Sequence, residues 1–129
     1  MMSEKTSCIV GERIENTGFH HTLSLISGKY RMAILYCLSE FGTVRFNEMK
    51  KFIHGITFKS LSSNLKILEE DGLVLRKDYG ENPPRVEYSL SELGTTLIPI
   101  LDAMCIWGEE HMDQKWQPPT NEPLVKYTN

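Results

Sequence analysis

The chain has 129 residues, of which 40% are hydrophobic and 24% charged, so it is long enough for one globular domain with its own core and too short for two. No apolar run approaches the ~20 residues that cross a bilayer, and the first residues lack the apolar stretch and cleavage site of a leader. We therefore expect a cytoplasmic protein without a membrane partner.

The net charge of −3 hides an uneven distribution along the chain. Residues 49–68 contain four lysines and no acidic residue, whereas residues 89–129 contain six acidic residues against two lysines. A whole-chain sum can conceal a local basic surface, so the charge does not exclude a polyanionic partner such as DNA.

Apolar spacing predicts two helices in the first third of the chain. Residues 22–27, TLSLIS, are expected to form a brief helix that ends at Gly28. Residues 29–41, KYRMAILYCLSEF, are expected to form a longer helix that Gly42 stops. The apolar positions recurring at helical spacing in this second helix are Ile34, Leu35, Leu38 and Phe41.

Two further helices are predicted around a short turn. TVRF, residues 43–46, is expected to be extended, and 47–53 is expected to form a short helix with Asn47 as its N-cap. The turn HGIT follows, and the Thr57 hydroxyl can cap a helix that runs to the stop at residues 71–72.

The helix over 57–71 has two distinct faces at about 100° per residue. Its apolar stripe is predicted to contain Phe58, Leu61, Leu65 and Leu68. Its opposite face is small, hydroxylated and cationic, with Lys59, Ser60, Ser63 and Lys66 pointing outward and Ser62 and Asn64 on the flanks. A short helix, a turn and a second helix of this kind are typical of a helix-turn-helix, whose second helix enters the major groove of DNA.

The stretch LVLRKDYGENPPRVEYSL alternates apolar and polar residues on both sides of a Gly- and Pro-containing loop, which predicts a two-stranded hairpin. Leu73, Leu75 and Lys77 are expected opposite Val86, Tyr88 and Leu90, with both prolines in the loop. The hairpin carries three cations, Arg76, Lys77 and Arg85. A basic hairpin after a helix-turn-helix predicts a winged helix, an α+β fold that is mainly α.

A long helix is predicted from a Ser91 cap through Met112, bent at Pro99. Its apolar stripe, rich in Met and Trp, is large for a monomer of this size and has the composition of a partner interface. The expected homodimer contacts are Leu97, Ile100, Leu101, Met104, Trp107 and Met112. The three prolines after residue 116 suggest an extended or flexible tail.

The sequence resembles the HxlR family of winged-helix transcriptional regulators. The resemblance rests on LISGKYRMAIL, on RFNEMKKFIHGITFKSLSSNLKILEEDGLVLRKDYGENPPRVEYSLSELG and on LIPILDAMCIWGEEH. It implies a homodimer that binds an inverted-repeat operator in double-stranded DNA, with helix 57–71 in the major groove and the wing, 73–90, on the flanking backbone. The candidate DNA contacts are Lys59, Ser60, Ser62, Ser63, Asn64, Lys66, Arg76, Lys77 and Arg85.

The same resemblance divides the chain into an N-terminal arm over 1–18, a winged-helix domain with its dimerisation helix over 19–113, and a flexible tail over 114–129. Many members of the family carry a cysteine ten residues before a GGKW-like motif, and in some that thiol senses oxidants. Here the motif reads SGKY and the corresponding residue is Thr17. Cys8, in the polar arm, remains a possible redox residue, although only Lys5 and Arg13 are near enough in sequence to depress its pKa.

The remaining cysteines and histidines give no sign of a chemical site. Cys37 falls among the apolar helical positions and is predicted to be a small core residue, and no CxxC or Cys/His cluster indicates a disulfide framework, metal or other cofactor. No histidine adjoins a nucleophile or paired carboxylates, so we predict that the protein is not an enzyme.

Two alternatives remain open: a winged helix used only for protein contacts, and a thiol-based sensor variant of the regulator. The operator, the sign of regulation and the effector cannot be read from the sequence.

Overall fold

The structure is a computed structural model of the chain, and it describes residues 13–114. The chain divides into two compact units, with the boundary between Ile98 and Pro99. Within residues 13–114, the first unit contains a 3-10 turn, five helices and a three-stranded sheet, and the second contains one helix. In chain order these are η1 Ile14–Asn16, α1 Gly18–Ile26, α2 Arg31–Phe41, β1 Val44–Arg45, α3 Phe46–Phe52, α4 Phe58–Glu70, β2 Val74–Asp78, β3 Val86–Leu90, α5 Glu92–Thr95 and α6 Ile98–His111.

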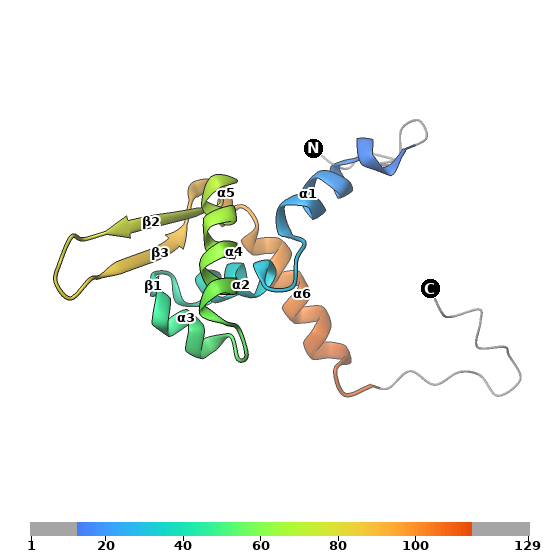
Figure 1. Ribbon diagram of the computed structural model, residues 1–129. Helices are drawn as coiled ribbons and strands as arrows, with labels where there is room; N and C mark the ends of the chain where they lie inside the picture. Colours follow the sequence, from blue (N-terminus) through green and yellow to red (C-terminus); the bar gives the residue numbers. More distant parts are fainter. Residues whose placement is uncertain (1–12, 115–129) are drawn as a thin grey trace, which may run out of the picture. The chain divides into compact units, whose positions relative to one another are not determined.

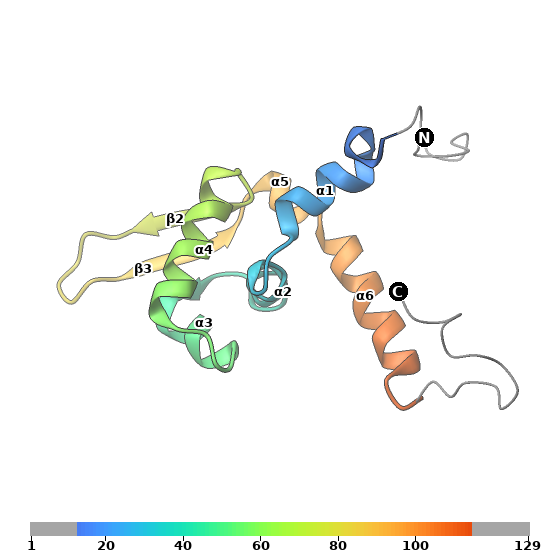
Figure 2. The ribbon, with the colours of Figure 1, turned by 45° about the vertical axis from the view of Figure 1, so that its right-hand side comes forward.

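The core of the first unit lies where α2, α3 and α4 meet the sheet (Figures 1 and 2). Leucines and isoleucines of α2 and α4 fill it, as their helical spacing predicted, and Met49 of α3 is fully buried with them. Phe41, which helical spacing placed on the apolar face of α2, is instead exposed at the end of that helix, and so is Phe52 at the end of α3. The rings contact each other edge to face, with centroids 5.1 Å apart.

The sheet has the order β1-β3-β2 and is antiparallel throughout. The segment expected only to be extended, TVRF, supplies β1, which pairs with β3 through Val44 opposite Tyr88. The predicted hairpin is present, but its register is wrong by one residue, because Arg76, not Leu75, lies opposite Tyr88. A slip of one residue reverses the faces of a strand, so Leu75 is exposed while Val74 is buried.

The two predicted helices at the beginning of the chain are present with different bounds. The brief helix begins at Gly18, four residues earlier than expected, because Thr17 caps it by accepting a hydrogen bond from the His20 amide at 3.1 Å. The Thr17 hydroxyl also donates to the Ile14 carbonyl oxygen at 2.6 Å, and the residue is buried. Gly42 ends α2 with a φ of +81°, as predicted.

The helix-turn-helix consists of α3, a turn through Gly55 and α4. The N-cap of α3 is Arg45 and not Asn47 as predicted, and its amide donates to the Glu48 carboxylate at 2.9 Å. Thr57 caps α4 as predicted, accepting from the Ser60 amide at 3.0 Å.

The long C-terminal helix that we predicted is two helices, α5 and α6. The Ser91 hydroxyl caps α5, as predicted, by accepting from the Gly94 amide at 2.9 Å, and it donates to the Gly72 carbonyl oxygen at 2.6 Å. Pro99 does not bend a continuous helix: it is the second residue of α6, in the first turn, where its missing N–H has no helical partner to lose. None of the helices in the described residues is long and apolar enough to cross a membrane.

Candidate DNA-binding surface

The outward face of α4 carries exposed lysine and serine side chains. Three leucines, Leu61, Leu65 and Leu68, anchor the opposite face in the core and thereby fix which side of the helix meets solvent. The exposed residues are Lys59, Ser62, Ser63 and Lys66. Because no acidic side chain precedes Glu69 in α4, this face is positive along most of its length.

Ser60 and Asn64, also predicted DNA contacts, are only partly exposed. The Asn64 amide nitrogen donates to the Ser60 carbonyl oxygen at 2.7 Å and reaches the Ser60 hydroxyl at 3.3 Å. The Asn64 donor is therefore already engaged within α4, and a bidentate contact with adenine would require this hydrogen bond to break.

The wing, β2 and β3 with the loop between them, places its three predicted cations in different surroundings. Arg76 lies 3.6 Å from the Asp78 carboxylate. Arg85 lies 3.5 Å from the Glu81 carboxylate, and its guanidinium stacks 3.6 Å above the Tyr79 ring. These acids offset part of the positive charge of the wing.

Tyr79 contacts three charged side chains of the wing, Lys77, Arg85 and Glu87. The Lys77 ammonium lies 4.8 Å from its ring centroid, so two cations, Lys77 and Arg85, contact the ring. The Tyr79 hydroxyl donates to the Glu87 carboxylate at 2.7 Å, and this hydrogen bond raises the pKa of the phenol. We did not identify Tyr79 from the sequence, where it reads as an ordinary strand residue.

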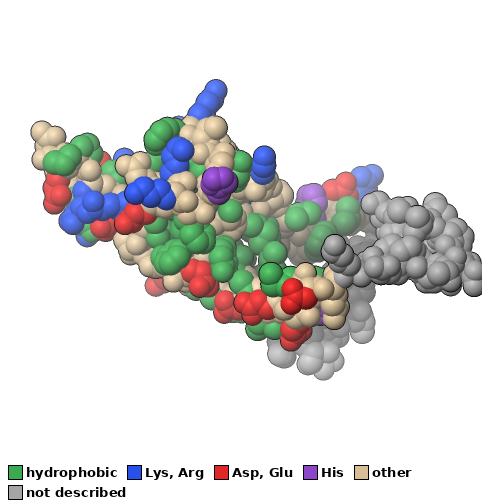
Figure 3. Space-filling model, turned by 90° about the horizontal axis from the view of Figure 1, so that it is seen from below, with side chains coloured by type: hydrophobic (Ala, Val, Ile, Leu, Met, Phe, Trp, Pro, Cys, Tyr) green, Lys and Arg blue, Asp and Glu red, His purple; other side chains and the backbone are tan. Residues whose placement is uncertain are grey.

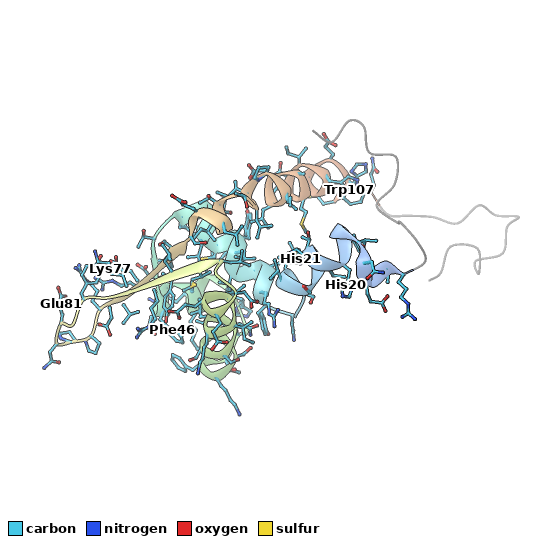
Figure 4. The ribbon with its side chains drawn as sticks, turned by 90° about the horizontal axis from the view of Figure 1, so that it is seen from above. His20, His21, Phe46, Lys77, Glu81 and Trp107 are labelled. Atoms are coloured by element: carbon cyan, nitrogen blue, oxygen red, sulfur yellow. The ribbon has the colours of Figure 1, made fainter. Side chains whose placement is uncertain are left out.

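A second group that sequence reasoning missed lies where α3 and α4 begin. Phe46 and Phe58 stack in parallel with centroids 5.9 Å apart, and the Lys50 ammonium lies 4.7 Å from the Phe58 centroid. Figure 4 labels Phe46 and, on the wing, Lys77 and Glu81. Seen from below in Figure 3, lysine and arginine side chains gather along one edge of the first unit, over α3, α4 and the wing.

The predicted dimer contacts lie in α6 and next to its ends, and they differ in exposure. Ile100, Met104 and Met112 are exposed, as is Trp107 at 65%, whereas Leu97 is half-buried. Leu101 is 5% exposed, so it is not accessible to a partner in this conformation. Trp107, labelled in Figure 4, stacks on His111 with ring centroids 4.4 Å apart.

The described residues contain two cysteines, Cys37 and Cys105. Cys37 is fully buried, as predicted, and burial together with the nearby Glu48 carboxylate raises its pKa to about 11. Cys105 is partly exposed in α6, and both cysteines are free. The possible redox residue Cys8 lies outside the described residues. Across 13–114, no group of three or more His, Cys, Asp or Glu side chains could hold a metal ion.

A helix-turn-helix followed by a basic antiparallel hairpin defines a winged helix, so the predicted fold class is confirmed. The chain belongs to the HxlR-like helix-turn-helix family, whose sequence profile matches residues 25–116, and the resemblance inferred from the sequence is confirmed.

Curated relatives and solved structures agree with this assignment. An uncharacterised HTH-type transcriptional regulator of Halalkalibacterium halodurans is 51% identical over 79% of this chain and 90% of its own length. The uncharacterised HTH-type transcriptional regulator YdzF of Bacillus subtilis is 47% identical over 74% and 88%. The redox regulator HypR in its reduced form is 41% identical, with a TM-score of 0.71 over 75% of this chain and 95% of that one.

Proposed function

We propose that this protein is a cytoplasmic, non-enzymatic transcriptional regulator that binds specific sites in double-stranded DNA as a homodimer. Its relatives in H. halodurans and B. subtilis are called HTH-type transcriptional regulators, which supports this function. The observation that carries the proposal is the outward face of α4, with Lys59, Ser62, Ser63 and Lys66 exposed and no acid before Glu69.

In the proposed complex, α4 lies in the major groove. Its serines allow the helix backbone to approach the bases, and its lysines reach phosphates on either side. The wing lies on the flanking backbone, where Lys77 and Arg85 contact phosphates, which position the protein without reading sequence. A protein-binding winged helix would not need an acid-free cationic face, so this face favours DNA over the alternative of protein contacts alone.

The proposed dimer forms through the exposed apolar residues of α6. A twofold axis relates the two copies of α4, and both reach the same side of the duplex when they are one helical turn apart, about 34–36 Å. The preferred site is therefore an inverted repeat with half-site centres about 10 base pairs apart, or a multiple of that spacing.

Selection from randomised duplexes with the purified full-length chain tests the proposal. We expect an inverted repeat, and an affinity for it that falls by ~0.9 log units per log unit of salt for each phosphate neutralised. If no duplex is retained, or if the retained duplexes bind independently of salt, the protein does not recognise DNA through this surface.

A further inference from the structure

Phe58 occupies an unusual position for a phenylalanine. It is the first residue of α4, and 60% of it is exposed, whereas the next three apolar residues on its stripe are buried in the core. Exposure of a large aromatic ring forgoes the favourable free energy that its burial in the core would contribute. Its position at the N-terminal end of the recognition helix, the end that contacts base edges in this fold class, suggests a use for the exposed ring.

The ring is held by its neighbours. Phe46 stacks on it at 5.9 Å with an interplanar angle of 2°, and the Lys50 ammonium lies 4.7 Å from its centroid. Asn47, Lys50 and Lys51 join Phe58 in lining a surface hollow of about 350 Å³. The hollow therefore combines a fixed apolar ring with two ammonium groups.

These features match the chemistry of one base edge. In the major groove, the C5-methyl of thymine is the apolar group on the base edges, and aromatic side chains contact it. A ring beside two lysines can touch this methyl while the ammonium groups face nearby phosphates. A cationic surface for non-specific DNA binding needs no such ring.

We propose that Phe58, supported by Phe46 and Lys50, forms a contact site for a thymine methyl group and thereby selects a thymine in each half-site. This inference rests on the proposed DNA-binding function and adds a base identity to it. The other polar groups of α4 do not fix one, because serine contacts several bases and the Asn64 donor is engaged within the helix.

The test replaces each thymine of the selected operator, one symmetric pair at a time, with deoxyuridine, which lacks only the methyl. For the wild type we expect one pair of positions at which affinity falls by about fourfold per methyl lost. Phe58→Ala should bind the thymine operator more weakly and should be insensitive to deoxyuridine at that pair. Phe58→Leu, which keeps an apolar side chain, should retain part of the sensitivity.

Phe41→Ala is the matched control, because Phe41 is 59% exposed but lies at the end of α2, outside the helix-turn-helix. It should leave both the affinity and the response to deoxyuridine unchanged, and circular dichroism should show all variants folded.

The inference is overturned if wild-type affinity is unaffected by deoxyuridine at every thymine, or if Phe58→Ala keeps the wild-type sensitivity. A uniform loss of affinity in Phe58→Ala on all duplexes would also overturn it, showing a sugar-phosphate contact. Failure of the wild type to bind any duplex would instead refute the proposed function itself.

Discussion

Helices α4 and α6 have nearly the same length, 13 and 14 residues, but opposite surface chemistry. In α4 the leucines are buried and the exposed face carries lysine and serine. In α6 the exposed face carries Ile100, Met104, Ile106 and Trp107, among the acids Asp102, Glu109 and Glu110. The first surface suits a polyanion and the second suits a protein.

The two surfaces differ in how well water solvates them. The exposed face of α4 carries lysine and serine side chains, which water solvates well in the absence of DNA. The exposed apolar residues of α6 form the kind of surface that marks a protein interface. We therefore expect the dimer to persist without DNA, and DNA to bind the preformed dimer.

The largest expected effect comes from breaking the proposed interface at its most exposed aromatic. Trp107→Glu should produce a monomer, and affinity for the full inverted repeat should fall by at least about 100-fold, because two linked half-sites gain a factor of about 10² to 10⁴ over one. Light scattering and DNA titration on the same sample measure both quantities.

Phe41→Glu serves as the control, since it also places a charge at an exposed aromatic, but in α2. It should remain dimeric. We choose Trp107 over Leu101, because Leu101→Glu would bury a charge within the single chain as well. A monomeric Trp107→Glu variant that binds the full site with unreduced affinity would show that dimerisation is not how this protein recognises DNA.

Substitution of one glycine in each unit, Gly94 in the first and Gly108 in the second, should change the free energy of unfolding in opposite directions. A Cβ at Gly94 would clash with the Leu73 backbone carbonyl, which cannot move without shifting the wing, whereas a Cβ at Gly108 in α6 meets no atom within 4 Å. Gly94→Ala should lower the free energy of unfolding by about 1–3 kcal/mol or more. Gly108→Ala should raise it by about 0.5–1 kcal/mol. Denaturant titration at fixed protein concentration measures both free energies of unfolding. If Gly108→Ala instead weakens the dimer, Gly108 contacts the partner's helix.

The α4 lysines should dominate the salt dependence of binding. Lys59→Ala and Lys66→Ala are each expected to reduce the magnitude of the slope of log affinity against log salt by ~1.8, because each removes one phosphate contact, worth ~0.9, from both subunits of the proposed dimer. Lys29→Ala, a charge change outside the helix-turn-helix and the wing, is the control and should leave the slope unchanged. If the salt slope is unaltered in both α4 variants, DNA binds another surface of the protein.

The sequence predicted α4 well and the C-terminal region less well, for physical reasons. Thr57 and Gly72 bound α4 through local hydrogen bonding and a positive φ, both of which a sequence reveals. Periodicity gives the direction of a side chain but not the depth of the core beneath it. Phe58 therefore shares a stripe with buried leucines and is nevertheless exposed.

Other features depend on contacts between distant segments, which the sequence does not show. The wing register was missed by one residue because both strands alternate and only the pairing of β1 with β3, far apart in the chain, fixes the buried face. Likewise, Pro99 is compatible with either a bend or a first turn, and the break after Thr95 decides between them.

The wing should contribute less than α4, because its cations are partly neutralised. Arg85→Ala should weaken binding to the operator and to unrelated duplexes by the same factor. The change in salt slope should stay below the ~1.8 of two full phosphate contacts, one from each subunit, since Glu81 already offsets part of the charge of Arg85. Tyr79→Leu should have a similar but smaller effect by releasing the Arg85 guanidinium from its ring. Competition titrations with both kinds of duplex measure the two variants, and a loss confined to the operator would show that Arg85 reads bases.

The smallest expected effect is that of thiol oxidants, even though HypR, a relative of known structure, is a redox regulator. Thiolate is the reactive form, and with a pKa of about 11 only about one Cys37 side chain in 10⁴ is ionised at pH 7. Raising the pH to 9 leaves Cys37 mostly protonated, and its burial excludes reagent. Thr17 stands where the family resemblance implies a cysteine in many members, which in some of them senses oxidants, and Thr17 is buried and caps α1. We therefore expect diamide to leave DNA affinity nearly unchanged in the wild type, in Cys8→Ser and in Cys105→Ser.

A loss of affinity that disappears in Cys8→Ser would make Cys8 a sensor. A loss that disappears in Cys105→Ser would instead indicate a thiol in α6 that reports on the dimer, and thus couple the two surfaces that the structure keeps chemically distinct.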